Sequence, residues 1–197
     1  MSYAETPTLR NDLVVLEQLD PGHEKDLAQA VTAEQLVRTW YASVPDPEQM
    51  AGEIRARLAL QSEGRLAPWA ILDTAAGRAV GMTTYLNLDE PNRRLEIGST
   101  WIGPRAQGTG INPAAKLLLL RRAFETLGCV AVEFRTDWHN HASRAAIARL
   151  GAKQDGVLRN HKVRADGTLR DTVVFSVLEH EWPSVRVGLE ARVARHR

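Results

Sequence analysis

Hydrophobic residues are spaced differently in different parts of the chain, and this spacing predicts where helices and strands lie. Between residues 22 and 62 they recur every three to four positions, as Met50, Ile54 and Leu58 do, which is the period of an amphipathic helix. Two prolines in the middle of this stretch divide it into at least two helices. A short apolar run at 13–19 precedes it and predicts a first strand.

From Trp69 onward the hydrophobic residues alternate or form short runs, which predicts strands separated by glycine-containing turns. Gly98, inside one of these strands, predicts a bulge or the close approach of another group. The expected strands are 69–72, 79–86, 93–102, 129–137, 156–164 and 172–178. The expected helices in this half are 113–127, 140–150 and a tail from residue 181.

The loop before the helix at 113–127 combines two glycines with a helix-start signal. We call residues 105–110, with the sequence RAQGTG, the glycine loop. Its glycines permit positive φ and let backbone N–H groups approach an anion closely. Asn112 can cap a helix whose first residue is Pro113, since proline has no N–H to leave unsatisfied. Loop and helix start would then converge on one phosphate. A plain strand-to-helix turn is the alternative.

Two other phosphate-binding motifs do not fit the glycine loop. A P-loop requires Gly-Lys-Ser/Thr after its second glycine, and a dinucleotide-binding fingerprint requires a third glycine where Pro113 stands.

The composition excludes several classes of protein. The 197 residues include 25 Lys and Arg against 24 Asp and Glu, and the net charge of +1 gives no electrostatic reason to expect a nucleic acid or a membrane as partner. The single cysteine, Cys129, excludes an internal disulfide and is expected to be a small buried side chain. The length suits one α/β domain, 1–197. The sequence shows no signal-peptide pattern and no apolar run of ~18 residues, so we expect the protein in the cytoplasm.

The order of elements resembles the GCN5-related N-acetyltransferases, the GNAT superfamily, along nearly the whole chain. Arg105, Gly108 and Gly110 match the family pattern Arg/Gln-x-x-Gly-x-Gly/Ala, which in that family binds the pyrophosphate of coenzyme A. In the second half, Asn140 and Ser143 resemble the RimJ/RimL branch, as do a Leu-Gly pair at 150–151 and a Glu-Trp pair at 181–182. That branch acetylates N-terminal amines of ribosomal proteins and has relatives that act on small amines.

The resemblance implies a fold, a reaction and a cofactor site. The fold is a mixed, mostly antiparallel, twisted sheet with helices on both faces. The reaction moves acetyl from acetyl-CoA to a primary amine by direct attack in a ternary complex, without a metal. A splayed strand end at 98–103 would offer free N–H groups to the cofactor. The residues expected to bind the cofactor are Ile102, Arg105, Gln107, Gly108, Thr109, Gly110, Asn112 and Asn140.

Two residues are the candidates for catalysis. Glu96 is expected to be the general base, because it lies on the strand leading to the glycine loop and resembles a glutamate common at that place in the branch. A surface glutamate paired with Arg93 or Arg94 is the alternative. Ser143 matches a serine near the sulfur and could donate to the leaving thiolate, or it could simply lie in the first turn of a helix capped by Asn140.

Two departures from the family pattern keep alternatives open. Ile147 stands where many GNAT enzymes carry a tyrosine acid, and Lys162, beside His161, stands where part of the RimL group has a glutamate. The base is therefore Glu96, His161 or a water chain. A non-catalytic module that binds acyl-CoA is the alternative function. The expected partner is an amine acceptor, a peptide N-terminus or a small molecule, and the family suggests a homodimer.

Other residues have both a functional and a structural interpretation. Trp40 and Tyr41 lie on the segment that walls the acceptor site in the family, although core packing explains them more simply. Lys116 could reach a phosphate of coenzyme A, but an exposed helix lysine is the simpler interpretation. His139 and His141 lack a further clustered ligand, so no metal site is expected there.

Overall fold

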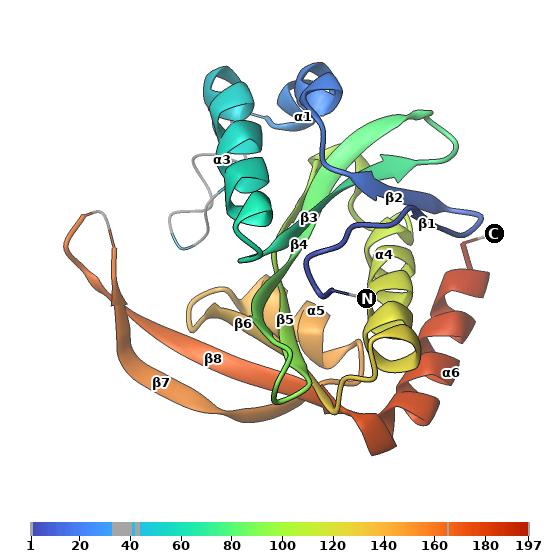
Figure 1. The fold of residues 1–197 in the computed structure, drawn as a ribbon, viewed down its shortest axis with the longest axis vertical. Coiled ribbons are helices and arrows are strands. Elements are labelled where there is room, and N and C mark those ends of the chain that lie inside the picture. The colour runs from blue at the N-terminus through green and yellow to red at the C-terminus, as the bar shows by residue number, and fades with distance from the viewer. Residues whose placement is uncertain (1, 33–40, 42–43, 165, 197) are drawn as a thin grey trace.

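The structure is a computed structural model that describes residues 2–32, 41, 44–164 and 166–196. In this part of the chain eight strands form one sheet in the order β1-β2-β3-β4-β5-β6-β8-β7 (Figure 1). Neighbouring strands are antiparallel except β5 and β6, which are parallel. The helix α4 connects these two strands, as a parallel pair requires a crossover connection.

The elements follow the order that the hydrophobic pattern predicts, except that the two-residue strand β1, which pairs with β2, is not among the expected strands. The strands are β1 (Leu9–Arg10), β2 (Val14–Gln18), β3 (Ala67–Asp73), β4 (Arg78–Asp89), β5 (Arg94–Ile102), β6 (Ala131–Asp137), β7 (Lys153–Val163) and β8 (Leu169–Leu178). The helices are α1 (Glu24–Ala30), α3 (Met50–Ser62), α4 (Ile111–Arg121), α5 (His141–Ala148) and α6 (Trp182–Ala194). Trp40 lies outside the described residues, while Tyr41 is half-buried.

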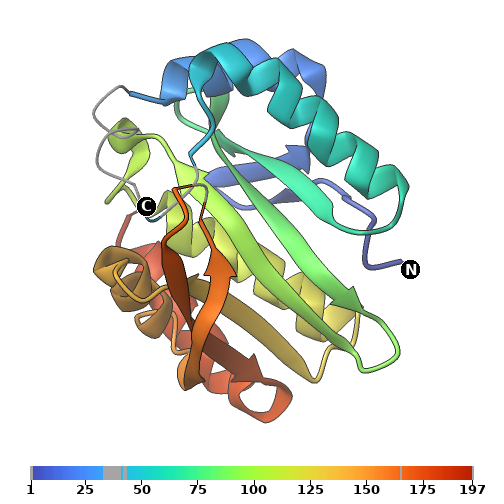
Figure 2. The same cartoon turned by 90° about the vertical axis from the view of Figure 1, so that its left-hand side faces the viewer.

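Helices cover both faces of the sheet. Figures 1 and 2 show α1 and α3 together on one side, where Leu27, Ile54 and Met82 belong to one buried cluster. On the other side, α4, α5 and α6 share a larger cluster that includes Leu119 and Phe134. The expected mixed, mostly antiparallel sheet with helices on both faces is therefore confirmed.

The helix α4 is the most buried helix of the described chain. All residues from Pro113 to Leu120 are buried, so the helix is buried all round, as an interior helix is, rather than on one stripe. It continues into a π-helical turn, Arg122–Thr126, and the chain turns away at Gly128 with φ of 67°, the left-handed stop that the sequence predicts. Among the described residues, no helix is long and apolar enough to cross a membrane.

Candidate active site

The parallel strands β5 and β6 separate part-way along their length. Their pairing covers three residues of each strand and ends with Glu96 opposite Glu133. Beyond this pair, β6 stays with β8 as far as Asp137, while β5 continues along β4 to Ile102. Within the described residues, the β6-facing edge of β5 therefore has no strand partner after Glu96. Backbone groups on such an edge need another partner, and the splay expected at 98–103 is present.

A β-bulge interrupts β5 on this unpaired stretch. Between Met82 and Thr84, the single residue Thr83 of β4 lies opposite both Ser99 and Thr100 of β5. Ser99 has φ of 45°, a conformation that costs free energy for a residue with a side chain. Such strained positions cluster at functional sites, where the surrounding structure maintains them.

Gly98, directly before the bulge, makes room for the carboxylate of Glu96. A Cβ at this position would lie 2.8 Å from Glu96 Oε1 and 2.9 Å from Leu86 Cδ1. Both features that a strand glycine predicts, a bulge and a close approach, are thus present here.

Glu96 is nearly buried, with 7% of its surface exposed. Its Oε2 accepts a hydrogen bond of 2.7 Å from Asn87 Nδ2 and lies 3.6 Å from Arg135 Nε. Burial raises the pKa of Glu96, while the charge of Arg135 and the Asn87 hydrogen bond oppose that rise. Arg93 and Arg94 bond to other groups, so the alternative of a surface ion pair with either residue is wrong.

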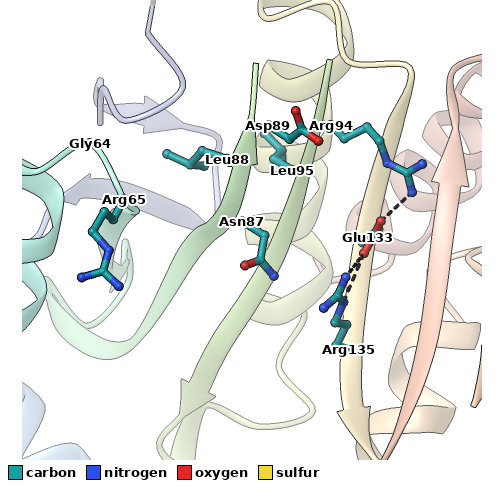
Figure 3. Close-up of a pocket in the computed structure, with 9 residues that line it drawn as sticks. All are labelled: Gly64, Arg65, Asn87, Leu88, Asp89, Arg94, Leu95, Glu133 and Arg135. Atoms are coloured by element: carbon teal, nitrogen blue, oxygen red, sulfur yellow. Dashed lines mark hydrogen bonds and ion pairs between the residues drawn. The ribbon is translucent and has the colours of Figure 1, made fainter. Parts of the chain in front are cut away.

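A cavity of about 570 Å³ lies beside this carboxylate, between the end of α3, the β4–β5 hairpin and β6 (Figure 3). Asn87 and Arg135, the two partners of Glu96, line it. Arg94 and Arg135 both bond to Glu133, at 2.5 and 2.8 Å. The volume suits a small molecule or the end of a peptide, and polar groups from three elements converge on it.

The glycine loop has the backbone that an anion site needs. Gly108 and Gly110 have φ of 78° and 87°. The N–H groups of Gly108, Thr109 and Gly110 donate to no acceptor in the described residues. The side chains of Gln107 and Thr109 bond to carbonyls of Ile102 and the loop itself, at 2.9 and 2.7 Å. These side chains bond to carbonyl groups and leave the three amide groups unoccupied; Gly108 and Thr109 are exposed, as is Arg105, while Gly110 is buried.

The start of α4 differs from the predicted one. Gly110 is the N-cap and Ile111 the first helical residue, and the N–H of Ala114 donates to Gly110 O at 3.0 Å. The prediction that Asn112 caps a helix beginning at Pro113 is therefore wrong. The left-handed glycine turns the chain straight into the helix, and Pro113 is still tolerated because first-turn N–H groups have no intrahelical acceptor.

The C-terminal end of α6 lies against the glycine loop. A Cβ at Gly110 would come within 2.6 Å of His196 Cγ, so this position requires glycine for its space as well as for its φ. Sequence reasoning missed this contact, because no local pattern relates residues so far apart in the chain.

The helix α5 begins on the other side of the β5–β6 gap, just after β6. Asn140 Oδ1 accepts from the Ser143 N–H at 2.9 Å, which confirms the predicted cap. Ser143 is half-buried in the first turn. Ile147, one turn later, is only 8% exposed and belongs to the large apolar cluster. Ile147, at the position where many GNAT enzymes carry a tyrosine, is thus packed in the hydrophobic core.

The hairpin of β7 and β8 carries the other candidate base, His161, beside Lys162. His161 Nδ1 lies 3.0 Å from Thr172 Oγ1, and the pKa of His161 is lowered by partial burial and by the charges of Lys162, Arg135 and Arg170. The charge of Lys162 also lowers the pKa of Glu96. In the described residues, Glu96 has the more buried and more directly bonded position.

Lys116 is the clearest departure from expectation. It is 5% exposed, and its Nζ lies 2.6 Å from Thr100 Oγ1 and 3.1 Å from Thr83 Oγ1. The interpretation as an exposed helix lysine is wrong. Cys129, by contrast, is buried as expected, and burial raises the pKa of its thiol. No group of three or more His, Cys, Asp or Glu that could hold a metal occurs among the described residues.

Sequence reasoning also missed Asn87 and Arg135, the partners of Glu96. A signal for Arg135 was present, because Glu133 and Arg135 alternate with buried Val132 and Phe134 along β6. A period of two puts both charged residues on one face, and the parallel pairing of β6 with β5 puts that face beside Glu96.

Comparisons with known proteins agree with this architecture. The Acetyltransferase (GNAT) domain family matches residues 14–153. The "Putative ribosomal N-acetyltransferase YdaF" of Bacillus subtilis is 37% identical over 106 residues, which cover 54% of this chain and 57% of that protein. The chain thus matches a little over half the length of this relative.

Two solved structures extend the likeness over most of the chain. A GCN5-related N-acetyltransferase from Brucella melitensis is 28% identical with a TM-score of 0.86, covering 96% of this chain and 86% of that one. Mycobacterium smegmatis RimJ in complex with CoA-disulfide shares the fold at 22% identity, with a TM-score of 0.81 and 97% of each chain covered. The family match includes β5, the glycine loop and α4, so the chain belongs to the GNAT acetyltransferases, a family of acyltransferases, and is similar to its RimJ/RimL-like members.

Proposed function

We propose that the protein transfers acetyl from acetyl-CoA to a primary amine by direct attack in a ternary complex. The observation that carries the proposal is the layout of β5. The gap to β6 opens at the buried Glu96, the bulge follows, and the glycine loop begins where the strand ends. An extended acyl-CoA can lie along this one edge with its diphosphate at the loop and its thioester near the bulge.

Each residue of the cofactor site has a role in this proposal. The amide groups of the glycine loop and the start of α4 hold the diphosphate, and the exposed Arg105 adds a positive charge. Ile102, Gln107 and Asn112 flank that site. Asn140 contacts the pantetheine arm from the α5 side of the gap.

The chemistry needs no covalent enzyme intermediate. The lone pair of the amine attacks the thioester carbon, and the carbonyl π pair moves onto oxygen, where free N–H groups at the bulge stabilise the charge. Collapse restores the carbonyl and breaks the C–S bond. The proton of the attacking nitrogen goes to Glu96, directly or through water. The Ser143 hydroxyl donates a hydrogen bond to the leaving thiolate, which takes up a proton from water, and Glu96 returns its proton to water. The products are an acetamide and coenzyme A.

The cavity beside Glu96 is where the acceptor amine binds in this proposal. It opens next to Asn87 and Arg135, on the α1 and α3 side of the sheet. The acceptor is a peptide N-terminus, as the name of the Bacillus relative suggests, or a small-molecule amine.

Replacing Glu96 with glutamine tests the proposal. We expect Glu96→Gln to keep acetyl-CoA binding, measured by calorimetry, and to lower turnover by about 10²- to 10⁴-fold, as loss of a general base does. Thiol release on a panel of peptides and small amines measures the turnover.

Glu190→Gln is the matched control, because Glu190 is exposed on α6 and pairs with Arg121; it should leave turnover unchanged. Acetyl-CoA binding by the wild type without transfer to any acceptor in the panel would instead favour a non-catalytic acyl-CoA module.

A further inference from the structure

Lys116 places an amine in the interior, directly behind the bulge of β5. Its side chain leaves α4 in the second turn and ends between Thr83 of β4 and Thr100 of β5. The two hydroxyls also bond to each other at 2.8 Å. The amine thus contacts β5, whose one edge pairs with β4 and whose other edge faces the β5–β6 gap.

Within the part of the chain that the structure describes, no opposite charge pairs with this ammonium group. In the described residues it makes no salt bridge, and its recorded partners are the two threonine hydroxyls. Burial alone lowers the pKa of Lys116 from 10.5 to about 7. An unpaired buried cation costs stability, and an apolar side chain of similar length would fill the same space without that cost. A residue that destabilises the fold in this way is a candidate for function.

We propose that Lys116, in its protonated form, is a positioning residue for acetyl transfer: it braces the bulge through Thr100 and supplies positive potential behind the thioester carbonyl. The inference rests on the proposed function. Lys116 transfers no proton and forms no bond to the substrate. Negative charge that develops on the carbonyl oxygen in the transition state is stabilised by a fixed cation that is itself buried.

The neighbours of this amine in the described residues come from four elements. Thr83 and Thr100 face it from β4 and β5, and neither titrates. Further along the same face of β4, Tyr85 is covered by the guanidinium of Arg122, 5.6 Å from its ring. The helix α6 contacts α4 through the exposed ion pair of Glu190 with Arg121. The segment before β2 contacts α4 through Asn11, whose side chain donates to the carbonyl of Ala114. Among the described residues, Lys116 is therefore the titratable group in direct contact with the two threonines behind the bulge.

Lys116→Met separates this role from a purely structural one. A structural lysine would destabilise the protein when removed, whereas here we expect equal or higher stability. The sign follows from linkage: the unfolded chain keeps the Lys116 proton up to about pH 10.5 and the folded chain only to about pH 7. Wild-type stability thus rises with pH across this window. The advantage of Lys116→Met in thermal unfolding should be largest below about pH 7 and should vanish toward pH 10.5.

The same variant should lower kcat by about 10- to 100-fold, less than loss of a direct oxyanion donor, with little change in KM for acetyl-CoA. The ratio of wild-type to variant kcat should fall as the pH rises through about 7, because the wild type then loses its cation. Groups common to both proteins cancel in this ratio.

Thr100→Val is a second variant, which keeps the amine but removes its contact with β5, and it should lower kcat in the same direction. Lys153→Met, at an exposed lysine on β7, should leave kcat unchanged. Unchanged kcat in both Lys116→Met and Thr100→Val would overturn this inference alone, as would a kcat ratio independent of pH. Absence of transfer by the wild type to any amine would overturn the proposed function itself.

Discussion

The side chains of Glu96 and Lys116 lie on opposite faces of β5, and burial shifts their pKa values in opposite directions. It raises the pKa of the carboxyl group and lowers that of the ammonium group, because low-dielectric surroundings disfavour whichever form is charged. Both groups move toward neutrality. One of these groups belongs to β5 and the other reaches β5 from α4, and two such groups where the strand leaves its partner are a stronger indication of a site than either alone.

Arg135 lowers the pKa of Glu96, the proposed base, and its removal should shift the pH profile of the reaction. Its positive charge lowers the pKa of Glu96, so Arg135→Met raises that pKa further. Glu96 then becomes a free carboxylate only at higher pH, and the acid limb of kcat/KM should move to higher pH.

Arg94→Met is the control for that shift. Arg94 bonds to the same Glu133 as Arg135 does, but only Arg135 contacts Glu96. The limb should stay in place in Arg94→Met. An equal displacement in both variants would show that Glu133, or the general charge of the cavity, controls the titration.

At the scale of elements, the glycine loop and α4 form one unit. Gly110 is at once the last residue of the loop, the cap of the helix and the contact of His196. Gly108 has a similar positive φ, but a Cβ there would meet nothing within 4 Å. Substitutions at these two positions therefore distinguish the free-energy cost of backbone strain, present at both, from the cost of a steric clash, present only at Gly110.

We expect Gly110→Ala to raise KM for acetyl-CoA more than Gly108→Ala does. Both variants carry the strain of a positive φ, about 1 kcal/mol, but only Gly110→Ala must also displace His196. The double variant Gly110→Ala/His196→Ala should recover part of the difference. Steady-state kinetics measure KM for acetyl-CoA, and urea unfolding measures the accompanying change in stability. If the double variant recovers nothing, the cost of Gly110→Ala lies in the loop backbone.

At the scale of the molecule, the sheet has two wings that meet at β5 and β6. One wing carries Glu96 and the glycine loop, and the other carries α5 with Asn140 and Ser143. A buried ion pair orders the second wing: Asp137, at the end of β6, bonds to Arg164 at the end of the β7–β8 hairpin, at 2.5 Å. It ties the hairpin to the segment that leads into α5.

Breaking this pair should cost far more than breaking an exposed pair on the same hairpin. Arg164→Met leaves Asp137, whose side chain is 1% exposed, without its main partner, and should lower the free energy of unfolding by about 3 kcal/mol. Arg159→Met removes an exposed partner of Asp171 and should cost under about 1 kcal/mol. Chemical denaturation compares the two, and equal losses would show that Arg170 compensates.

The sequence by itself determined the elements, their order and the glycine loop, because helical and strand periods and turn glycines are local properties of the chain. It also pointed to Glu96 by its place on a strand. Only the tertiary structure decided which side chains surround that carboxylate, that Gly110 rather than Asn112 starts α4, and that Lys116 is buried behind a bulge. Those outcomes depend on strand register and on packing between residues far apart in the chain, and no local pattern encodes them.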